Sequence, residues 1–210
     1  VREELRRGLG GLLGRDPHLW QHPPRTVDGF LAVGTPGDMD VVAQAVDEDE
    51  VADLAEGGYL ITTGEWEGTD TLVVTASSDR GLVYGTFHLL RLLTTREPIA
   101  DVHIEEEPTS PDRLINHWDN PFRGSMERGY AGQSIFDFER LPDLRERYRD
   151  YARLLGSVGI NGIVLNNVNT QIPGREEGNE AMEQLEGWRL LETRYLEKLT
   201  GLGSMFRRYG

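Results

Sequence analysis

Cysteine is absent from the 210 residues of this chain, and lysine occurs only at Lys198. Without cysteine the chain has no disulfide, no thiolate nucleophile and no zinc–thiolate site. It also has no apolar run long enough to span a bilayer and no recognisable secretory signal at its amino end. We therefore expect a cytoplasmic protein that does not work at a membrane.

Basic residues are scarce as a group, since 22 of them stand against 36 acidic residues and the formal net charge is −14. Nearly all of the basic residues are arginines, and they form no basic stripe, so we do not expect binding to nucleic acid. An acidic surface almost without lysine is typical of proteins that work in concentrated salt, because salt screens the repulsion between carboxylates. A GC-rich genome also favours arginine over lysine, although it does not explain the acidic excess.

The first half of the chain has the pattern of a small α+β domain. An amphipathic helix is expected over residues 1–14, and strands are expected over 29–34, 59–63, 71–76 and 101–105. Asp38 is expected to cap a short helix that ends at Val46. Ser78 and Asp79 are expected to cap a longer helix that ends near Leu93, with Tyr84 and His88 at the edge of the core. The segment around Trp20 carries no motif, and packing is its default role.

The pattern changes after the break at Pro108–Pro111. Strands are expected over 113–117 and 160–165, the second buried on both faces, and helices over about 144–158 and 188–208. This βαβα order predicts an α/β fold with a parallel sheet, the first two units of a (β/α)8 barrel. We place the domains at 1–108 and 109–210. Because eight units close such a barrel, we expect the barrel to be incomplete here and the chain to be the amino-terminal part of a larger enzyme.

The segment between Arg113 and Phe136 is the most informative part of the sequence. A short strand leads into a turn-rich stretch with many groups that recognise polar ligands, a layout typical of the carboxyl end of a barrel strand. The candidate ligand-binding residues of this stretch are Trp118, Asn120, Glu127 and Arg128. An indole stacks on a pyranose ring, and a guanidinium matches a carboxylate in bidentate geometry. The alternatives are a core tryptophan, an asparagine that fixes the turn, and an ion pair of Glu127 with Arg128 or Arg123 that only holds the loop.

Two further candidates, Asn166 and Asn167, follow the second apolar strand directly. Side chains alternate along a strand, so only one of them is expected to point into the barrel mouth, and Asn166 is the slightly better candidate. His117 lies on the first strand and is expected to face the barrel interior. No metal site is expected there, because no other ligand stands at metal spacing beside it.

Several of these segments resemble the α-glucuronidases of glycoside hydrolase family 67. The resemblance is carried by INHWDN at 115–120, ERGYAGQSIF at 127–136 and YARLLGSVGINGIVLNNVN at 151–169, and more loosely by DRGLVYGTFHLLRLL at 79–93 and DGFLAVGTP at 28–36. It implies a small first domain, a catalytic (β/α)8 barrel, a helical domain and a homodimer. It also implies an inverting hydrolysis without cofactor or metal, with catalytic acids on later barrel strands, beyond Gly210.

The expected function is therefore that of an α-glucuronidase whose substrate is a xylan-derived oligosaccharide carrying α-1,2-linked (4-O-methyl)glucuronic acid. The 210 residues are expected to be inactive alone, since the catalytic acids are missing from them. Two alternatives stay open. One is a non-catalytic carbohydrate-binding protein, and the other is a related glycosidase with a different sugar specificity.

Overall fold

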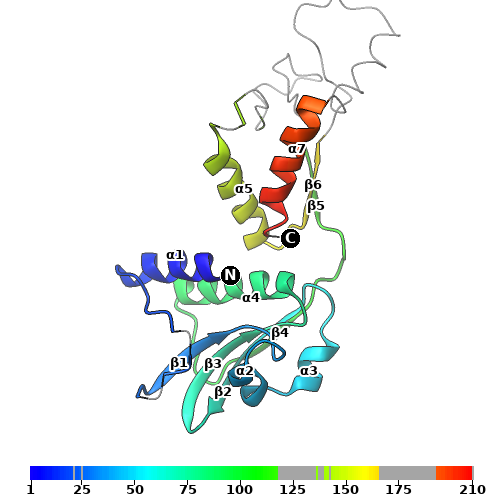
Figure 1. The fold of residues 1–210 in the computed structure, drawn as a ribbon. Helices are drawn as coiled ribbons and strands as arrows, with labels where there is room; N and C mark the ends of the chain where they lie inside the picture. Colours follow the sequence, from blue (N-terminus) through cyan, green and yellow to red (C-terminus); the bar gives the residue numbers. More distant parts are fainter. Residues whose placement is uncertain are drawn as a thin grey trace, which may run out of the picture. The chain divides into compact units, whose positions relative to one another are not determined.

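The computed structural model describes residues 1–20, 22–24, 26–117, 136, 140–141, 143–165 and 193–209, with the side chains of 193–195 left aside. The described residues form two compact units. The first contains residues 1–111 together with 156–159, and the second contains 112–155 and 160–210. Each unit is built around its own sheet (Figure 1).

The first unit contains a four-stranded mixed sheet in the order β1-β3-β2-β4. The strands are β1 (Gly29–Val33), β2 (Tyr59–Trp66), β3 (Thr69–Thr75) and β4 (His103–Glu106). β1 pairs with β3 in parallel, and β2 pairs with β3 and β4 in antiparallel fashion. All four expected strands are confirmed, with bounds that differ by a few residues at several ends.

Helices cover both faces of this sheet (Figure 1). Alternation along β1 and β3 sends Ala32 and Val73 to the face of α2 (Asp40–Ala45), and Val74 to the face of α4 (Asp79–Thr95). The third helix, α3 (Glu48–Asp53), packs through Val51 on Leu60 of β2. The first helix, α1 (Arg2–Leu13), packs on α4, where Gly8 faces Leu90.

The β2–β3 hairpin closes through a turn at Glu67 and Gly68, both with positive φ, 47° and 79°. Two consecutive residues of positive φ give a turn whose twist matches that of the strands. The hairpin is longer than its sequence pattern predicts, because Gly64 lies inside β2 and pairs with Thr71. A side chain at Gly64 would meet the carbonyl oxygen of Ala45 at 2.3 Å, which explains the glycine in a strand.

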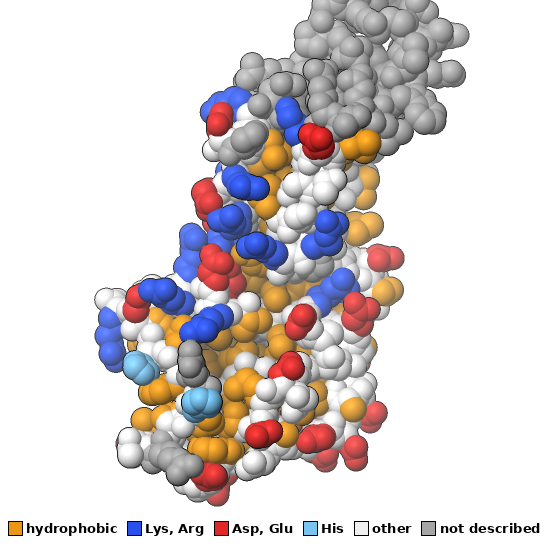
Figure 2. Space-filling model, viewed as in Figure 1, with side chains coloured by type: hydrophobic (Ala, Val, Ile, Leu, Met, Phe, Trp, Pro, Cys, Tyr) orange, Lys and Arg blue, Asp and Glu red, His pale blue; other side chains and the backbone are white. Residues whose placement is uncertain are grey.

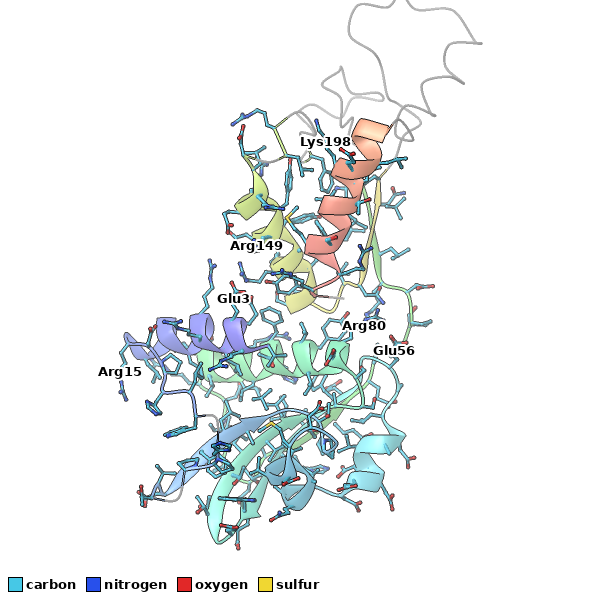
Figure 3. The ribbon with its side chains drawn as sticks, viewed as in Figure 1. Glu3, Arg15, Glu56, Arg80, Arg149 and Lys198 are labelled. Carbon is cyan, nitrogen blue, oxygen red and sulfur yellow. The ribbon has the colours of Figure 1, made fainter. Side chains whose placement is uncertain are left out.

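Helix α4 begins at the expected place. The Ser78 hydroxyl accepts a hydrogen bond from the Gly81 N–H at 3.2 Å, which satisfies one free amide of the first turn. In the same turn Arg80 pairs with Glu56 at 3.0 Å (Figure 3). Gly81 lies so close to the backbone of Gly58 that a Cβ atom there would be 2.1 Å from its carbonyl oxygen. Glycine therefore lets this end of α4 approach the start of β2.

One expectation for the first unit is wrong, and one helix was missed. Asp38 does not cap the short helix, because its carboxylate accepts a hydrogen bond from the Thr35 hydroxyl at 2.8 Å and the residue before α2 is Met39. Helix α3 was not expected from the sequence, since its acidic first turn resembles a solvated loop. Asp47 caps α3 by accepting from the N–H of Asp49 at 3.0 Å.

The second unit contains two parallel strands, β5 (Leu114–His117) and β6 (Gly162–Leu165), with α5 (Arg145–Ser157) between them in the chain. Helix α7 (Thr193–Phe206) follows β6. The expected βαβα order and the parallel pairing are confirmed. The assignment of the second unit to a (β/α)8 barrel, and of the ranges 1–108 and 109–210 to domains, stays a prediction.

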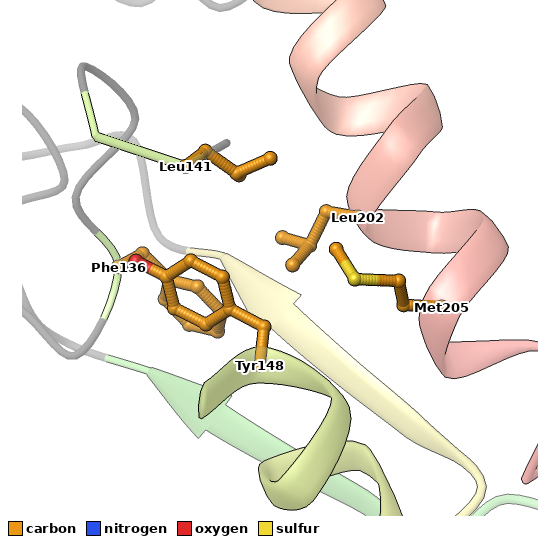
Figure 4. Close-up of a cluster of buried hydrophobic side chains, with 5 residues drawn as sticks. All are labelled: Phe136, Leu141, Tyr148, Leu202 and Met205. Atoms are coloured by element: carbon orange, nitrogen blue, oxygen red, sulfur yellow. The ribbon is translucent and has the colours of Figure 1, made fainter. Parts of the chain in front are cut away.

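The core of the second unit lies between the sheet and its helices. Phe136 and Tyr148 stack with ring centroids 5.6 Å apart and an angle of 21° between planes, and Leu141, Leu202 and Met205 surround them (Figure 4). Ile163 and Leu165 of β6 pack against this cluster. Phe136, the last residue of the segment 113–136, thus packs against side chains of α5 and α7.

The expectation that strand 160–165 is buried on both faces is wrong for these 210 residues. Val164 of β6 is 40% exposed, and Leu114, on the same face of β5, is 54% exposed. Both lie on the face of the two-stranded sheet away from the helices, where no described residue packs over them.

Among the described helices, none combines the length and apolar character that crossing a membrane requires.

Candidate functional site

The candidate site lies where β5 and β6 end. The two strands run in parallel with Leu114 opposite Gly162 and His117 opposite Leu165. Their carboxyl ends are therefore side by side at one end of the sheet. Trp118 follows His117 in the sequence, and Asn166 follows Leu165.

The register of this strand pair is held by Asn161, which sequence reasoning missed. The Asn161 side-chain oxygen accepts from the Arg113 N–H at 2.8 Å, and the Asn161 N–H donates to the Arg113 carbonyl at 3.0 Å. The two bonds join the chain segments just before the strands begin. The sequence signal for this role was a polar residue, Asn161, directly before the apolar strand β6.

The two faces of the strand pair differ in character. Ile115, His117, Ile163 and Leu165 are partly buried, whereas Leu114, Asn116 and Val164 are exposed. The exposed face therefore carries an amide between apolar side chains. In a closed barrel this face would point inward, because barrel helices lie outside the strands.

His117 does not lie on that open face, so the expectation that it faces the barrel interior is wrong. Its Nε2 atom is 2.9 Å from the Tyr151 hydroxyl of α5, and its ring contacts Phe136 edge-on at 5.0 Å. Strand alternation explains the result, since His117 shares a face with Ile115. His117 thus fastens the end of β5 to the helix layer, one residue before Trp118.

The predicted ligand-binding residues themselves lie outside the described residues. They are Trp118, Asn120, Glu127, Arg128, Asn166 and Asn167. Their assignment stays a prediction, and what the structure describes is the pair of strand ends that leads to two of them. Within the described part of the chain, no three His, Asp or Glu side chains are grouped so as to hold a metal ion.

In the first unit, Tyr59 and His88 form a second hydrogen-bonded pair, and the pKa of each is shifted. The Tyr59 hydroxyl is 2.8 Å from Nδ1 of His88, between β2 and α4. Burial, assisted by the negative charge of Glu106, raises the pKa of Tyr59 to about 12. Burial, assisted by the positive charge of Arg91, lowers the pKa of His88. Both groups are therefore held neutral, as suits a hydrogen bond at the edge of a core.

Comparison with family models gives two matches that together cover nearly the whole chain. The description "Glycosyl hydrolase family 67 N-terminus" fits residues 1–89, and "Glycosyl hydrolase family 67 middle domain" fits residues 92–210. The second match contains both strand ends of the candidate site.

Curated relatives agree with this result. Alpha-glucuronidase A of Emericella nidulans is 33% identical over 79% of the chain. Two proteins named probable alpha-glucuronidase A, from Aspergillus terreus and Aspergillus oryzae, are 31% and 36% identical over 99% of it. The chain spans only about a fifth of the length of these relatives, 20% to 22%.

Among solved structures, a GH138 enzyme targeting pectin rhamnogalacturonan II is similar over 86% of this chain and 24% of its own, with 14% identity and a TM-score of 0.47. That similarity carries no argument about fold or function. The family models and the curated relatives define the class of protein, which is the glycosyl hydrolases. More particularly, the chain belongs to glycosyl hydrolase family 67, and the resemblance found in its motifs is confirmed.

Proposed function

We propose that the protein is an α-glucuronidase that removes α-1,2-linked (4-O-methyl)glucuronic acid from xylo-oligosaccharides with inversion. The observation that carries the proposal is membership of family 67 over a segment in which two parallel strands end side by side before Trp118 and Asn166. The names of the curated relatives support the choice of sugar acid.

In this proposal the segment after β5 recognises the uronic acid. Trp118 stacks on the apolar face of the pyranose, and Asn120 hydrogen-bonds its hydroxyls. Arg128 pairs with the sugar carboxylate in bidentate geometry, which a lysine would not reproduce. Glu127 accepts hydrogen bonds from neighbouring hydroxyls. The segment thus selects for a ring that carries one negative charge.

The asparagines after β6 complete the first wall of the site. Asn166 points into the barrel mouth and contacts the sugar, and Asn167 is the alternative candidate for this contact. His117 and Asn161 act as positioning residues, since the first fixes the end of β5 on α5 and the second fixes the register of the strands. Binding groups held by packed neighbours lose less freedom when the substrate arrives.

Hydrolysis itself is proposed to depend on residues beyond Gly210. In an inverting glycosidase one carboxylic acid protonates the leaving oxygen while a carboxylate activates a water, with the two groups roughly 6.5–9.5 Å apart. In this proposal neither group is among the 210 residues, which are inactive alone, and the whole protein works as a homodimer. Remaining barrel strands would cover Leu114 and Val164, which are exposed here.

The test is the release of glucuronic acid from aldouronic acids by the whole protein. We expect turnover with the uronide, none with an analogue in which a neutral hexose replaces the uronic acid, and none with residues 1–210 alone. Binding of the uronide without turnover by the whole protein would instead support the carbohydrate-binding alternative. Turnover of the neutral analogue at the same rate would support a different sugar specificity. Either result overturns the proposal.

A further inference from the structure

A cavity of about 330 Å³ opens in the first unit beside β1, one of the two edge strands of its four-stranded sheet. Its apolar lining comes from three elements and the segment between two of them. The apolar lining residues that matter here are Leu5 and Leu9 of α1, Phe30 and Val33 of β1, and Val41 of α2. Leu5 and Val41 belong to the buried core, so the floor of the cavity is part of the fold.

The rim of the cavity is aromatic and basic. Trp20, for which the sequence predicts only a packing role, lines it and is 48% exposed. His18 contacts the Trp20 ring edge-on, with centroids 4.7 Å apart and an angle of 62° between planes. His22 and Arg2 also line the cavity and are exposed. Figure 2 shows histidine side chains next to exposed hydrophobic surface on this face of the first unit.

Acidic residues are missing from this lining as far as the structure describes it. That is unusual for a chain with 36 acidic and 22 basic residues. Arg2 stands in the first turn of α1, where a cation opposes the helix dipole, so helix stability does not explain its place. The basic rim therefore favours a ligand that carries a negative charge, and the apolar floor favours a ligand that also has an apolar group.

We propose that this cavity binds a small aromatic carboxylate. The flat ring packs between Trp20 and the apolar floor, and the carboxylate accepts hydrogen bonds from the Arg2 guanidinium and from an imidazole N–H at the rim. The volume lies at the lower end of the range of roughly 300–1,000 Å³ that is typical of ligand pockets. A sugar acid fits the lining less well, because its hydroxyls would face Leu9, Phe30 and Val33 without partners.

The proposal concerns the first unit alone and does not depend on the proposed hydrolysis. Titration calorimetry of the intact chain with three probes tests it. Cinnamate has a flat apolar body and a carboxylate, cinnamamide has the same body without charge, and glucuronate has the charge without the apolar body. We expect cinnamate to bind at least roughly tenfold more tightly than either of the other two, because only cinnamate uses both the rim and the floor.

Variants at the rim locate the binding. Trp20→Ala should raise the dissociation constant of cinnamate roughly tenfold, Trp20→Phe should restore most of the affinity, and Arg2→Gln should raise the constant roughly fivefold. Arg15→Gln is the matched control, since this exposed arginine follows α1 outside the cavity lining (Figure 3). It should leave the constant unchanged. Trp20 and Arg2 are exposed, and an unchanged melting temperature of each variant checks that folding is kept.

Three results would overturn the proposal. The first is that cinnamate does not bind, and the second is that cinnamamide or glucuronate binds equally well. The third is that cinnamate binding is indifferent to both Trp20→Ala and Arg2→Gln, since the ligand would then occupy another place on the molecule.

Discussion

At the scale of single residues, two hydrogen-bonded histidine–tyrosine pairs join strands to helices within the described residues. His117 meets Tyr151 in the second unit, and His88 meets Tyr59 in the first. His117 of the first pair directly precedes Trp118 in the sequence, and the second pair lies on the α4 face of the mixed sheet. Burial lowers the pKa of His88 and favours its neutral form, whereas the structure shows for His117 a hydrogen bond with the Tyr151 hydroxyl.

The His88 pair predicts a specific dependence of stability on pH. The pKa of His88 is lowered from 6.5, mainly by burial, so the unfolded chain binds a proton before the folded chain does. Stability should therefore fall as the pH drops below about 6.5, until the lower pKa of the folded state is reached. His88→Gln should reduce this loss, measured as the change in the free energy of unfolding by urea between about pH 7.5 and pH 5.5.

A matched variant separates burial from hydrogen bonding in this prediction. Tyr59→Phe removes the hydroxyl but keeps the ring that shields His88. Because burial is the largest cause of the lowered pKa, this variant should keep most of the loss at acid pH. Equal pH dependence in the parent chain and in His88→Gln would show that the account of His88 is mistaken.

At the scale of helices and strands, close approach at one glycine sets where α4 lies on its sheet. A Cβ atom at Gly81 would be 2.1 Å from the Gly58 carbonyl oxygen and 2.7 Å from the Cβ atom of Ala76. Gly81→Ala must therefore shift the backbone, and we expect it to cost about 3 kcal/mol of stability. Thermal or urea unfolding of the variant measures the loss.

Gly11→Ala in α1 is the matched control for Gly81→Ala. Nothing lies within 4 Å of a Cβ atom at Gly11, which is exposed and inside the helix. Alanine favours a helix over glycine by up to about 1 kcal/mol, so this variant should be as stable as the parent or slightly more stable. Similar stabilities of the two variants would mean that α4 does not approach the start of β2 so closely.

Much of the element order was predictable from the sequence because local signals were strong. Ser78 capped α4 as expected, and the apolar run before Asn166 gave β6. Helix α3 was missed because its acidic first turn carries little apolar periodicity. The sequence also predicts Asp38 as a cap, but its carboxylate accepts a hydrogen bond from the Thr35 side chain three residues before it, and only the folded turn reveals this pairing.

The candidate site was predictable only in part. Two strands with polar residues just after them predicted strand ends that lie together, and β5 and β6 do end in register. It was harder to predict which side chains of each strand face the helices. Side chains alternate between the two faces of a strand, and β5 carries a polar residue on each face, Asn116 on one and His117 on the other, so the pattern does not decide between them. Contact with Tyr151 decides the phase, and that contact joins residues 34 positions apart in the chain.

At the scale of the whole molecule, the acidic composition predicts a response to salt. With a formal net charge of −14, repulsion between carboxylates destabilises the compact state at low ionic strength. Raising KCl from about 0.1 M to about 1 M shortens the screening length from roughly 10 Å to roughly 3 Å. We expect the melting temperature to rise over this range. A flat or falling melting temperature would favour genome composition as the origin of the arginine bias.

The central claim is that the ends of β5 and β6 contribute to one uronic acid site. A double-mutant cycle in the whole protein, with glucuronic acid binding measured for Trp118→Ala, Asn166→Ala and both together, tests it most directly. We predict that each substitution weakens binding and that their effects differ from additivity by at least about 0.5 kcal/mol, as expected for side chains that share one ligand. Unchanged binding in either single variant, or strict additivity, would contradict the claim.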